Sequence, residues 1–385
     1  MIWCLLAFAS AHEVAVFSED PLPNSRAVFG EAGELLEART GVPLTGWQWV
    51  EASQLSQGRL GVARREPVEP PLAHHDYAPA TPVFASDWHA PAPAGLGVAK
   101  LWAWPGGTGA ASVVANVEYD FDPFHEDLRG NLPIPVTGEP YGQFAYHGNA
   151  TFGIVAAARD TFGTSGAAPD SLMFAAHPIY DGRYSVARAI AEAALQMQAG
   201  DVLLVEQQWQ IEGTFSPVST NPMAADAMLA ASELGIIVVE PMGNGGTDAI
   251  TWDLPWVGSL RIGSIDPASG RRSTFSNFGV ATDLCAWGAE IVAPSNEEYA
   301  PDLYFPNGDP LQAYTSAFGG TSGASAQLAG IVAQLQSISR VVHDQPLSAE
   351  MLREGLAETG VASNPESPCA QIPDARSFAL HFLVP

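Results

Sequence analysis

Short apolar runs alternate with helical patterns along the chain from about residue 101 onward. The apolar runs are continuous, as expected for strands buried on both faces of a sheet, and they lie at residues 112–118, 172–179, 202–207, 236–240 and 260–265. The helical patterns lie at residues 186–198, 223–234, 322–337 and 348–358, the last with Ser348 as its expected cap. This alternation predicts an α/β fold, a three-layer sandwich with a mostly parallel central sheet and helices on both faces. In such a sheet, functional groups collect at the carboxyl ends of the strands.

The first hundred residues have a different pattern. Residues 12–75 contain a strand-like run at 12–17, a helical pattern at 26–39 and another short run at 60–63, which predicts a small N-terminal extension. Residues 76–100 are rich in proline and alanine, which is typical of a linker. Residues 101–385 are long enough for one large α/β domain.

Residues 1–11 have features of a signal peptide, because an apolar run is followed by the small-residue sequence Ala9-Ser10-Ala11. A positively charged segment ahead of the run is missing, so an ordinary first strand is the alternative. The run is too short to cross a bilayer, and no other stretch approaches the roughly 18 apolar residues that a spanning helix needs. We therefore expect a secreted protein without a membrane anchor.

Acidic residues outnumber basic residues by 42 to 16, which gives a formal net charge of −26. A polyanion repels phosphate backbones and anionic lipid surfaces, so neither nucleic acid nor a membrane surface is an expected partner. The acidic surface is expected to keep the protein soluble, and we expect a monomer.

Three cysteines occur, and no two of them form a Cys-x-x-Cys pair, so a zinc-ribbon or thioredoxin-type site is not expected. Cys4 would leave with the signal peptide. Cys285 and Cys369 would then form one disulfide in an oxidising compartment or remain as two buried thiols, because spacing alone does not fix their geometry.

Two segments place a reactive side chain at the start of a helix. Ser322 precedes a long helix of small residues, where backbone N–H groups and the helix dipole favour negative charge. The alternative is a serine that only caps the helix. His147 opens a second helical segment, HGNATFG, which would present a base at a helix start, or it is a surface histidine in a loop.

Two further segments place polar side chains where strands end. The strand at residues 112–118 ends in Glu118 and is followed by Asp120 and Asp122, which could orient a histidine or form a solvated acidic turn. The strand at residues 236–240 runs into a glycine-rich turn that holds Asn244. Its side-chain amide could donate to a developing oxyanion, or the residue could simply adopt a left-handed turn conformation.

The order acid, histidine, asparagine, serine resembles that of the subtilisin-like serine peptidases. Ser322 lies in GTSGASAQLAG, His147 in HGNATFG and Asn244 in VVEPMGNGG, which match the family's nucleophile helix, histidine helix and Gly-Asn turn. The resemblance covers about residues 101–359. It implies a subtilisin-like sandwich in which Ser322 is the nucleophile, His147 the general base and Asn244 an oxyanion-hole donor.

The acidic position departs from the family pattern. Aligning HEDL at residues 125–128 with the family's His-Pro-Asp-Leu puts Glu118 at the position of the catalytic aspartate. Glutamate can accept the same hydrogen bond from the histidine, but it is one methylene longer, and misplacement by about 1 Å can cost on the order of 10²-fold in rate. Asp120 and Asp122, later in the turn, are the alternatives.

The reaction that the resemblance implies requires no cofactor. The resemblance also implies features that lie away from the catalytic residues. Asp127 and Asp160 match ligands of a structural calcium site in the family, and carboxylates suit calcium; the alternative is two surface aspartates. The N-terminal extension, residues 12–75, would be either a removable pro-region or a permanently packed segment. Substrate would lie beside the strand at residues 203–208, where Glu206 either favours basic side chains or faces solvent.

These observations predict a secreted serine endopeptidase that cleaves protein or peptide substrates through an acyl-enzyme. The first alternative is a catalytically weak or inactive protein that keeps the subtilase fold as a binding module, and Glu118 is the feature that keeps it open. The second is a serine hydrolase of another fold, which would require Gly-x-Ser-x-Gly and a histidine after the serine. Neither is present around Ser322, and His147 precedes the serine.

Overall fold

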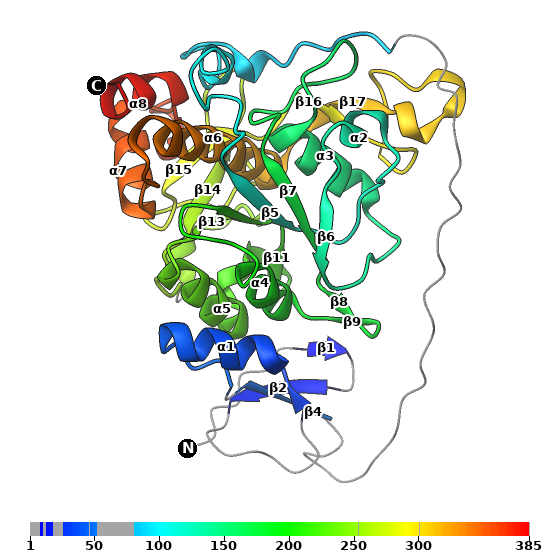
Figure 1. Cartoon of the computed structure of the whole chain (residues 1–385), viewed down its shortest axis with the longest axis vertical. Coiled ribbons are helices and arrows are strands. Elements are labelled where there is room, and N and C mark those ends of the chain that lie inside the picture. Colours follow the sequence, from blue (N-terminus) through cyan, green and yellow to red (C-terminus); the bar gives the residue numbers. More distant parts are fainter. Residues whose placement is uncertain are drawn as a thin grey trace.

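The computed structural model describes residues 8–10, 13–17, 26–45, 47–51, 81–252, 254–299 and 301–384. Its centre is a seven-stranded sheet with the strand order β15-β14-β13-β10-β5-β7-β6, in which every neighbouring pair is parallel (Figure 1). The strands are β5 (Val113–Val117), β6 (Ile134–Thr137), β7 (Leu172–Ala176), β10 (Val202–Val205), β13 (Ile237–Pro241), β14 (Leu260–Ile265) and β15 (Leu284–Trp287). The predicted parallel sheet is confirmed.

Helices cover both faces of the sheet, which confirms the three-layer sandwich (Figure 1). On one face lie α3 (Ala145–Ala156) and α6 (Gly320–His343), and on the other lie α4 (Val186–Ala194) and α5 (Pro222–Glu233). Successive residues of a strand point to opposite faces. In β10, Val202 and Leu204 therefore join one hydrophobic cluster, and Leu203 and Val205 join the other.

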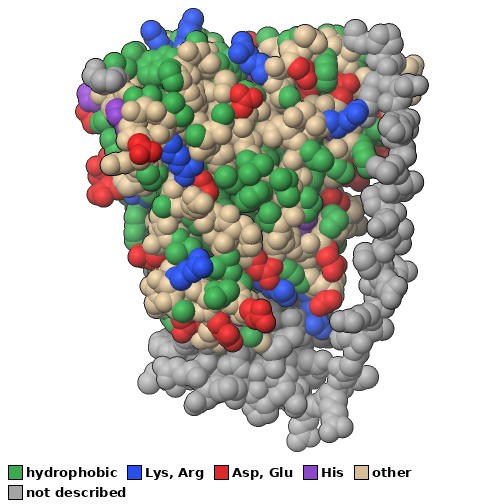
Figure 2. Space-filling view, viewed as in Figure 1, with side chains coloured by type: hydrophobic (Ala, Val, Ile, Leu, Met, Phe, Trp, Pro, Cys, Tyr) green, Lys and Arg blue, Asp and Glu red, His purple; other side chains and the backbone are tan. Residues whose placement is uncertain are grey.

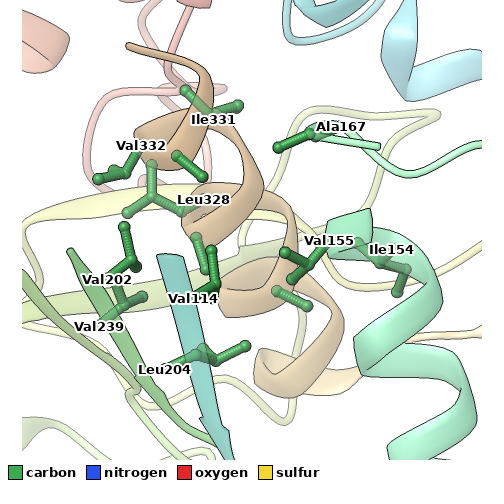
Figure 3. Close-up of a cluster of buried hydrophobic side chains, with 14 of the residues drawn as sticks. Val114, Ile154, Val155, Ala167, Val202, Leu204, Val239, Leu328, Ile331 and Val332 are labelled. Carbon is green, nitrogen blue, oxygen red and sulfur yellow. The ribbon is translucent and has the colours of Figure 1, made fainter. Parts of the chain in front are cut away.

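The cluster between the sheet and α6 positions the start of that helix. Leu328, Ile331 and Val332 of α6 pack towards Val202 and Val239 of the sheet, as Figure 3 shows. Most residues of α6 are buried, including the polar side chains along it. A helix enclosed in this way is held by packing rather than by intrinsic helix propensity, so its N-terminus has a fixed place relative to the strand ends.

The sequence located the long elements to within a few residues. Ser348 caps α7 (Ala349–Thr359), as expected, by accepting a hydrogen bond from the Met351 N–H. The sequence analysis did not find the strands β6 and β15 or the helix α8 (Ala375–Phe382). These elements are short, and β6 is an edge strand whose first residues are exposed, so none has the long apolar run of a central strand.

Smaller elements complete the domain. Three antiparallel pairs are β8 (Ile179–Tyr180) with β9 (Arg183–Tyr184), β11 (Gln208–Ile211) with β12 (Thr214–Pro217), and β16 (Ile291–Pro294) with β17 (Tyr314–Phe318). The short helix α2 spans Glu126–Arg129. Turns of 3₁₀ helix lie at Asp87–His89, Val98–Lys100, Val218–Thr220, Ala249–Thr251, Pro306–Gly308 and Pro310–Gln312.

The N-terminal extension packs on the α4–α5 side of the sandwich (Figure 1). It contains an antiparallel sheet of order β1-β2-β4-β3 and the helix α1 (Gly30–Thr40); the strands are β1 (Phe8–Ser10), β2 (Glu13–Phe17), β3 (Arg26–Ala27) and β4 (Trp47–Glu51). Phe29, Leu36 and Leu44 are buried in the same cluster as α4 and α5. The predicted strand at residues 12–17 is confirmed, the helix predicted at 26–39 begins only at Gly30 because residues 26–27 form β3, and the run at 60–63 lies outside the described residues.

The remaining N-terminal predictions stay open. Residues 1–7 of the predicted signal peptide, with Cys4, lie outside the described residues, while residues 8–10 form β1. The predicted linker at residues 76–100 is described from residue 81, where it follows an irregular path over the domain. Within the described parts of the chain, no helix is long and apolar enough to cross a membrane.

Cys285 and Cys369 form a disulfide with a Cα–Cα distance of 6.2 Å. It joins β15 to the segment that precedes α8, so of the two alternatives left open by the sequence the structure shows the disulfide rather than two free thiols. The acidic side chains visible on the face in Figure 2 are scattered among neutral and basic side chains rather than gathered in one patch. This distribution agrees with an acidic surface that serves solubility.

Candidate active site

A cleft of about 380 Å³ lies where the carboxyl ends of β5 and β10 meet the N-termini of α3 and α6. The predicted residues Glu118, His147 and Ser322 all line it. Its other lining residues are Tyr119, Phe144, Tyr146, Glu206, Gln207, Gln208, Phe215, Pro241 and Thr321. The structure therefore brings together at one edge of the sheet three side chains that are far apart in the sequence.

Glu118 contacts His147 directly. It follows β5, and its side chain is only 1% exposed. His147 Nδ1 lies 2.6 Å from Glu118 Oε2 and donates to it, while Glu118 Oε1 accepts the Tyr119 N–H at 2.8 Å. The hydroxyl of Thr151, one turn further along α3, lies 3.4 Å from Oε2. The longer glutamate side chain thus reaches the imidazole through Nδ1. The other ring nitrogen, Nε2, does not contact Glu118.

Asp120 and Asp122 do not take this role. Asp120 accepts hydrogen bonds from the backbone N–H groups of Phe121 and Gly142. Asp122 accepts the N–H of Phe124. Both carboxylates stabilise the turn after β5, so Glu118 is the member of the acidic segment that orients the histidine.

The start of α3 approaches the end of β5 closely at Gly148. A Cβ atom at this position would lie 1.9 Å from the Asp120 carbonyl oxygen and 3.0 Å from Glu118 Cγ. Only glycine fits there without moving the helix. The glycine after His147 in the sequence is therefore what lets the imidazole reach the carboxylate.

Ser322 lies in the first turn of α6, and Asn244 lies beside it in the loop after β13. Asn244 Oδ1 accepts hydrogen bonds from both the N–H and the hydroxyl of Thr321, each at 3.0 Å. A Cβ atom at Gly320 would lie 3.4 Å from Asn244 Nδ2. Gly320 has φ +77°, a conformation that glycine adopts without strain. The side-chain amide of Asn244 therefore lies against the first turn of α6, with its nitrogen and its oxygen at similar distances from the Cβ position of Gly320.

Two residues support the Asn244 loop, and of these Asn277 carried no recognisable signal in the sequence, whereas Thr321 lies in the motif around Ser322. Asn277 is fully buried, and its amide donates to the carbonyl oxygens of Met242 and Phe215, while its oxygen accepts the Thr247 N–H. It thereby fixes the loop that carries Asn244. Thr321 also accepts the Gly243 N–H at 3.2 Å, which ties the same loop to α6.

Glu206 was expected either to face solvent or to favour basic substrate side chains, and the first alternative is wrong, whereas the second stays a prediction. Its side chain is 4% exposed and lies in the wall of the cleft, where Oε1 accepts the Ser325 hydroxyl at 2.7 Å. The sequence did contain a signal for the place of Glu206 in the site. A glutamate directly after a continuous apolar run falls at the carboxyl end of a buried strand, where functional groups collect.

Burial and charge shift the ionisation of the cleft residues. Burial alone would lower the pKa of His147, but the charge of Glu118, its hydrogen bond and the charge of Glu206 raise it to about 9. Burial raises the pKa of Glu206 to about 8, although His147 opposes this. Burial also raises the pKa of the Tyr119 phenol to about 12. The two carboxyl groups therefore favour the imidazolium form of His147.

Aromatic side chains form part of the wall of the cleft. Tyr119 and Phe144 have ring centroids 5.6 Å apart, and the ring of Tyr146 lies 6.3 Å from that of His147. Phe144 and Phe215 keep 43% and 40% of their surface exposed. A largely apolar wall with a few converging polar groups is the usual composition of a substrate cleft.

The two predicted calcium ligands have different surroundings. Asp127 is buried, its Oδ2 accepts the N–H and hydroxyl of Thr164, and its Oδ1 accepts the hydroxyl of Tyr314 at 2.8 Å. Burial raises its pKa to about 7. Asp160 is exposed and accepts the Phe162 N–H.

Protein donors thus satisfy Asp127 without a cation. Among the residues that the structure describes, no three histidine, cysteine or acidic side chains form a group that could hold a metal ion. This donor set does not fit a calcium site built from carboxylates, and calcium binding at Asp127 and Asp160 stays a prediction.

The chain is similar to known peptidases in sequence and structure. The model of the Subtilase family matches residues 109–368. Subtilisin BL from Lederbergia lenta is 27% identical over 213 residues, which cover 54% of this chain and 70% of that protein. Subtilisin NAT from Bacillus subtilis subsp. natto is 24% identical over 307 residues, which cover 74% of this chain and 70% of that protein.

A solved structure supports the same fold. A protease from Pseudoalteromonas arctica PAMC 21717 superposes with a TM-score of 0.59 at 18% identity, over 77% of this chain and 96% of that one. At this identity the superposition bears on the fold alone. It agrees with the parallel sheet and the helices on both of its faces.

Proposed function

The chain belongs to the subtilase family and is a serine endopeptidase, and we propose that Ser322, His147, Glu118 and Asn244 carry its chemistry. The observation on which this proposal depends is the 2.6 Å contact between His147 Nδ1 and Glu118 Oε2, in a cleft that Ser322 also lines. A carboxylate at Nδ1 fixes the tautomer in which Nε2 is free to accept a proton. Because this contact has normal hydrogen-bond length, the extra methylene of glutamate does not prevent Glu118 from taking the orienting role.

In the proposed reaction, His147 Nε2 takes the proton of Ser322 as Oγ attacks a peptide carbonyl carbon. The carbonyl oxygen becomes an oxyanion, which accepts hydrogen bonds from Asn244 Nδ2 and the Ser322 backbone N–H. His147 then gives its proton to the leaving amine as the C–N bond breaks, which leaves an acyl-enzyme on Ser322. Water hydrolyses this ester when His147 accepts a proton from it, and the proton returns to Ser322.

Peptide segments of proteins are the proposed substrates, and we propose that they are cleaved outside the cell. The disulfide between Cys285 and Cys369 supports an oxidising compartment, where such bonds persist. The apolar run ahead of Ala9-Ser10-Ala11 supports secretion from the sequence side. No observation favours the alternative of a binding protein without activity.

The test compares hydrolysis of a fluorogenic peptide by the full chain and three variants. Ser322→Ala should lose at least about 10⁴-fold in kcat/KM, because it removes the nucleophile. Glu118→Gln should lose on the order of 10⁴-fold, because an amide at this position favours the wrong tautomer of the histidine. Glu118→Asp should retain more activity than Glu118→Gln, since it keeps the charge.

The comparison can also contradict the proposal. A Ser322→Ala chain as active as the unmodified chain would exclude Ser322 as the nucleophile. Equal activity of Glu118→Gln and the unmodified chain would exclude Glu118 as the orienting group. If even the unmodified chain hydrolyses no peptide at any pH, the inactive binding protein becomes the better account.

A further inference from the structure

Glu206 is a buried carboxyl group that the reaction described above does not use. It follows β10 directly, between the segment that carries Glu118 and the loop that carries Asn244 in the order of the sheet. It lines the same cleft as His147 and Ser322 but is only 4% exposed. A carboxyl group in this place is costly to bury unless its oxygens have partners.

Only one of the two Glu206 oxygens has such a partner. Oε1 lies 2.7 Å from the hydroxyl of Ser325, which also lies 2.9 Å from the Thr321 carbonyl oxygen and 3.0 Å from that of Ser322. Glu206 therefore contacts the first turn of α6 through the residue one turn after the catalytic serine. Oε2 is buried and has no well-formed hydrogen bond within the described chain, although the Ser322 hydroxyl also interacts with the Glu206 carboxyl group and lowers its pKa. An unpaired buried oxygen of this kind requires a functional or structural reason.

Two carboxyl groups, one imidazole and two phenols line the cleft. Glu118 faces it from the end of β5, His147 from α3 and Glu206 from the end of β10. The phenols of Tyr119 and Tyr146 also line it, but burial raises the pKa of each, so both stay neutral over the range in which the other groups titrate. From α6, the hydroxyls of Ser322 and Ser325 lower the pKa of Glu206, opposing the effect of burial.

We propose that Glu206 is a positioning residue of the peptidase reaction, which anchors the first turn of α6 through Ser325 and sets the pH at which His147 can accept the proton of Ser322. The proposal rests on the function assigned above. It differs from the role of Glu118, which orients the imidazole by direct contact. Glu206 acts on the histidine through space and on the serine helix through a hydrogen bond.

The direction of the effect follows from charge. A nearby negative charge favours the imidazolium form of a histidine and so raises its pKa. His147 must lose its proton before it can take one from Ser322, so a carboxylate at Glu206 moves the acidic limb of the activity profile to higher pH. Because His147 and Glu206 interact, their protons are lost in two steps that belong to the pair. Removal of the Glu206 charge should therefore move the acidic limb to lower pH.

The test measures kcat/KM against pH for Glu206→Gln, Glu206→Asp and the unmodified chain, with a fluorogenic peptide as substrate. Glu206→Gln keeps the shape and an oxygen for Ser325 but removes the charge, and we expect its acidic limb to lie about one pH unit lower. Because the pKa of Glu206 is raised to about 8, its charge is present in the unmodified chain mainly above that pH, so the gain in kcat/KM for Glu206→Gln should be largest between about pH 8 and 9 and small near neutral pH. Glu206→Asp keeps the charge, so its limb should stay close to the original.

The matched control is Glu354→Gln, which removes one exposed negative charge from α7 on the outside of the domain. Its pH profile should coincide with that of the unmodified chain. If the limbs of Glu206→Gln and the unmodified chain coincide while both hydrolyse the peptide, the proposal is wrong and the peptidase assignment stands. If Ser322→Ala hydrolyses the peptide as fast as the unmodified chain, the peptidase assignment fails first.

A second measurement covers the case in which Glu206→Gln does not fold. The protonation of the His147 imidazole can be followed directly by NMR in the Ser322→Ala chain, because this measurement does not require catalytic activity. The proposal predicts a shift in two steps, since the resonance senses the ionisation of Glu206 as well as its own. A single step would contradict it.

Discussion

One methylene separates glutamate from aspartate, and at residue 118 the surrounding backbone compensates for it. The carboxylate of Glu118 is held by the Tyr119 N–H on one oxygen and by His147 on the other. Tyr119 lies in the turn that follows β5, and His147 lies in α3, where Gly148 leaves room for the longer side chain. A residue that departs from the family pattern can thus keep the contact on which the pattern depends.

The buried side chain of Asp127 leads to a prediction about how the stability of the folded protein depends on pH. Its pKa is raised in the folded protein to about 7 because of burial, so the folded state favours the protonated form. The contribution to stability is complete below the ordinary aspartate pKa and is lost as the pH rises through about 7. Asp127→Asn, which resembles the protonated side chain, should therefore lose less stability than the unmodified chain between about pH 4 and 7.

Thermal unfolding at a series of pH values checks this prediction, and each kcal/mol of difference corresponds to about 2–4 °C in a domain of this size. The exposed Asp160→Asn is the control and should follow the unmodified chain. Parallel curves for Asp127→Asn and the unmodified chain would refute the account. A large rise in melting temperature of the unmodified chain on addition of calcium would instead support a calcium site at Asp127.

The ends of strands and the starts of helices carry the residues that line the cleft. The carboxyl ends of β5, β10 and β13 lie next to one another in the sheet, and α3 and α6 begin above them on one face. The side chains that must meet are therefore within three residues of an element boundary. Their mutual distances depend on how closely each helix packs on the strand ends.

Gly148 is the position at which this dependence can be tested. In Gly148→Ala, the new methyl group would meet the Asp120 carbonyl oxygen, which is backbone and cannot move aside. The start of α3 must then shift, and His147 with it. We expect kcat/KM to fall by on the order of 10²-fold or more while the chain stays folded, because misplacement of about 1 Å costs this much.

Gly323→Ala is a matched control beside the other catalytic residue. Its methyl group would meet Ile291 Cδ1, the far end of a flexible side chain, at 2.5 Å, and this atom can rotate away. The variant should retain most of its activity and a similar circular dichroism spectrum. If both glycine variants lost activity equally, close packing at Gly148 would not explain the position of His147.

At the scale of the whole molecule, the disulfide holds the C-terminal segment against the sheet. Cys285 and Cys369 are 84 residues apart, so their bond closes a long loop that includes α6 and α7. Closure of a long loop restricts the unfolded chain, and its loss should cost about 2–4 kcal/mol. Denaturant unfolding with and without reductant measures this for the unmodified chain.

The double variant Cys285→Ala/Cys369→Ala provides the control, because its stability should be low and independent of reductant. Mass spectrometry of alkylated thiols establishes that the bond is reduced in the unmodified chain. If reduction left the unfolding midpoint unchanged, the disulfide would make no contribution and the C-terminal segment would be held by packing alone.

Sequence patterns predicted the parts of this molecule that repeat along the chain or match a compact motif. Central strands such as β10 and β14 are continuous apolar runs, and each catalytic segment has its own short signature. The sequence could not supply contacts between distant segments. Asn277 supports the Asn244 loop from more than thirty residues away, and Glu206 becomes buried only when α6 packs over it. Such roles depend on tertiary structure and leave no periodic pattern.

The most direct measurement of the central claim is the site at which a fluorophosphonate reacts with the full chain. We predict a single covalent adduct on the peptide that carries Ser322, with a rate that rises with pH as His147 loses its proton, and no adduct in Ser322→Ala or His147→Ala. An adduct on another serine, or none in the unmodified chain at any pH, would contradict the convergence of Glu118, His147 and Ser322 on one reacting carbonyl group.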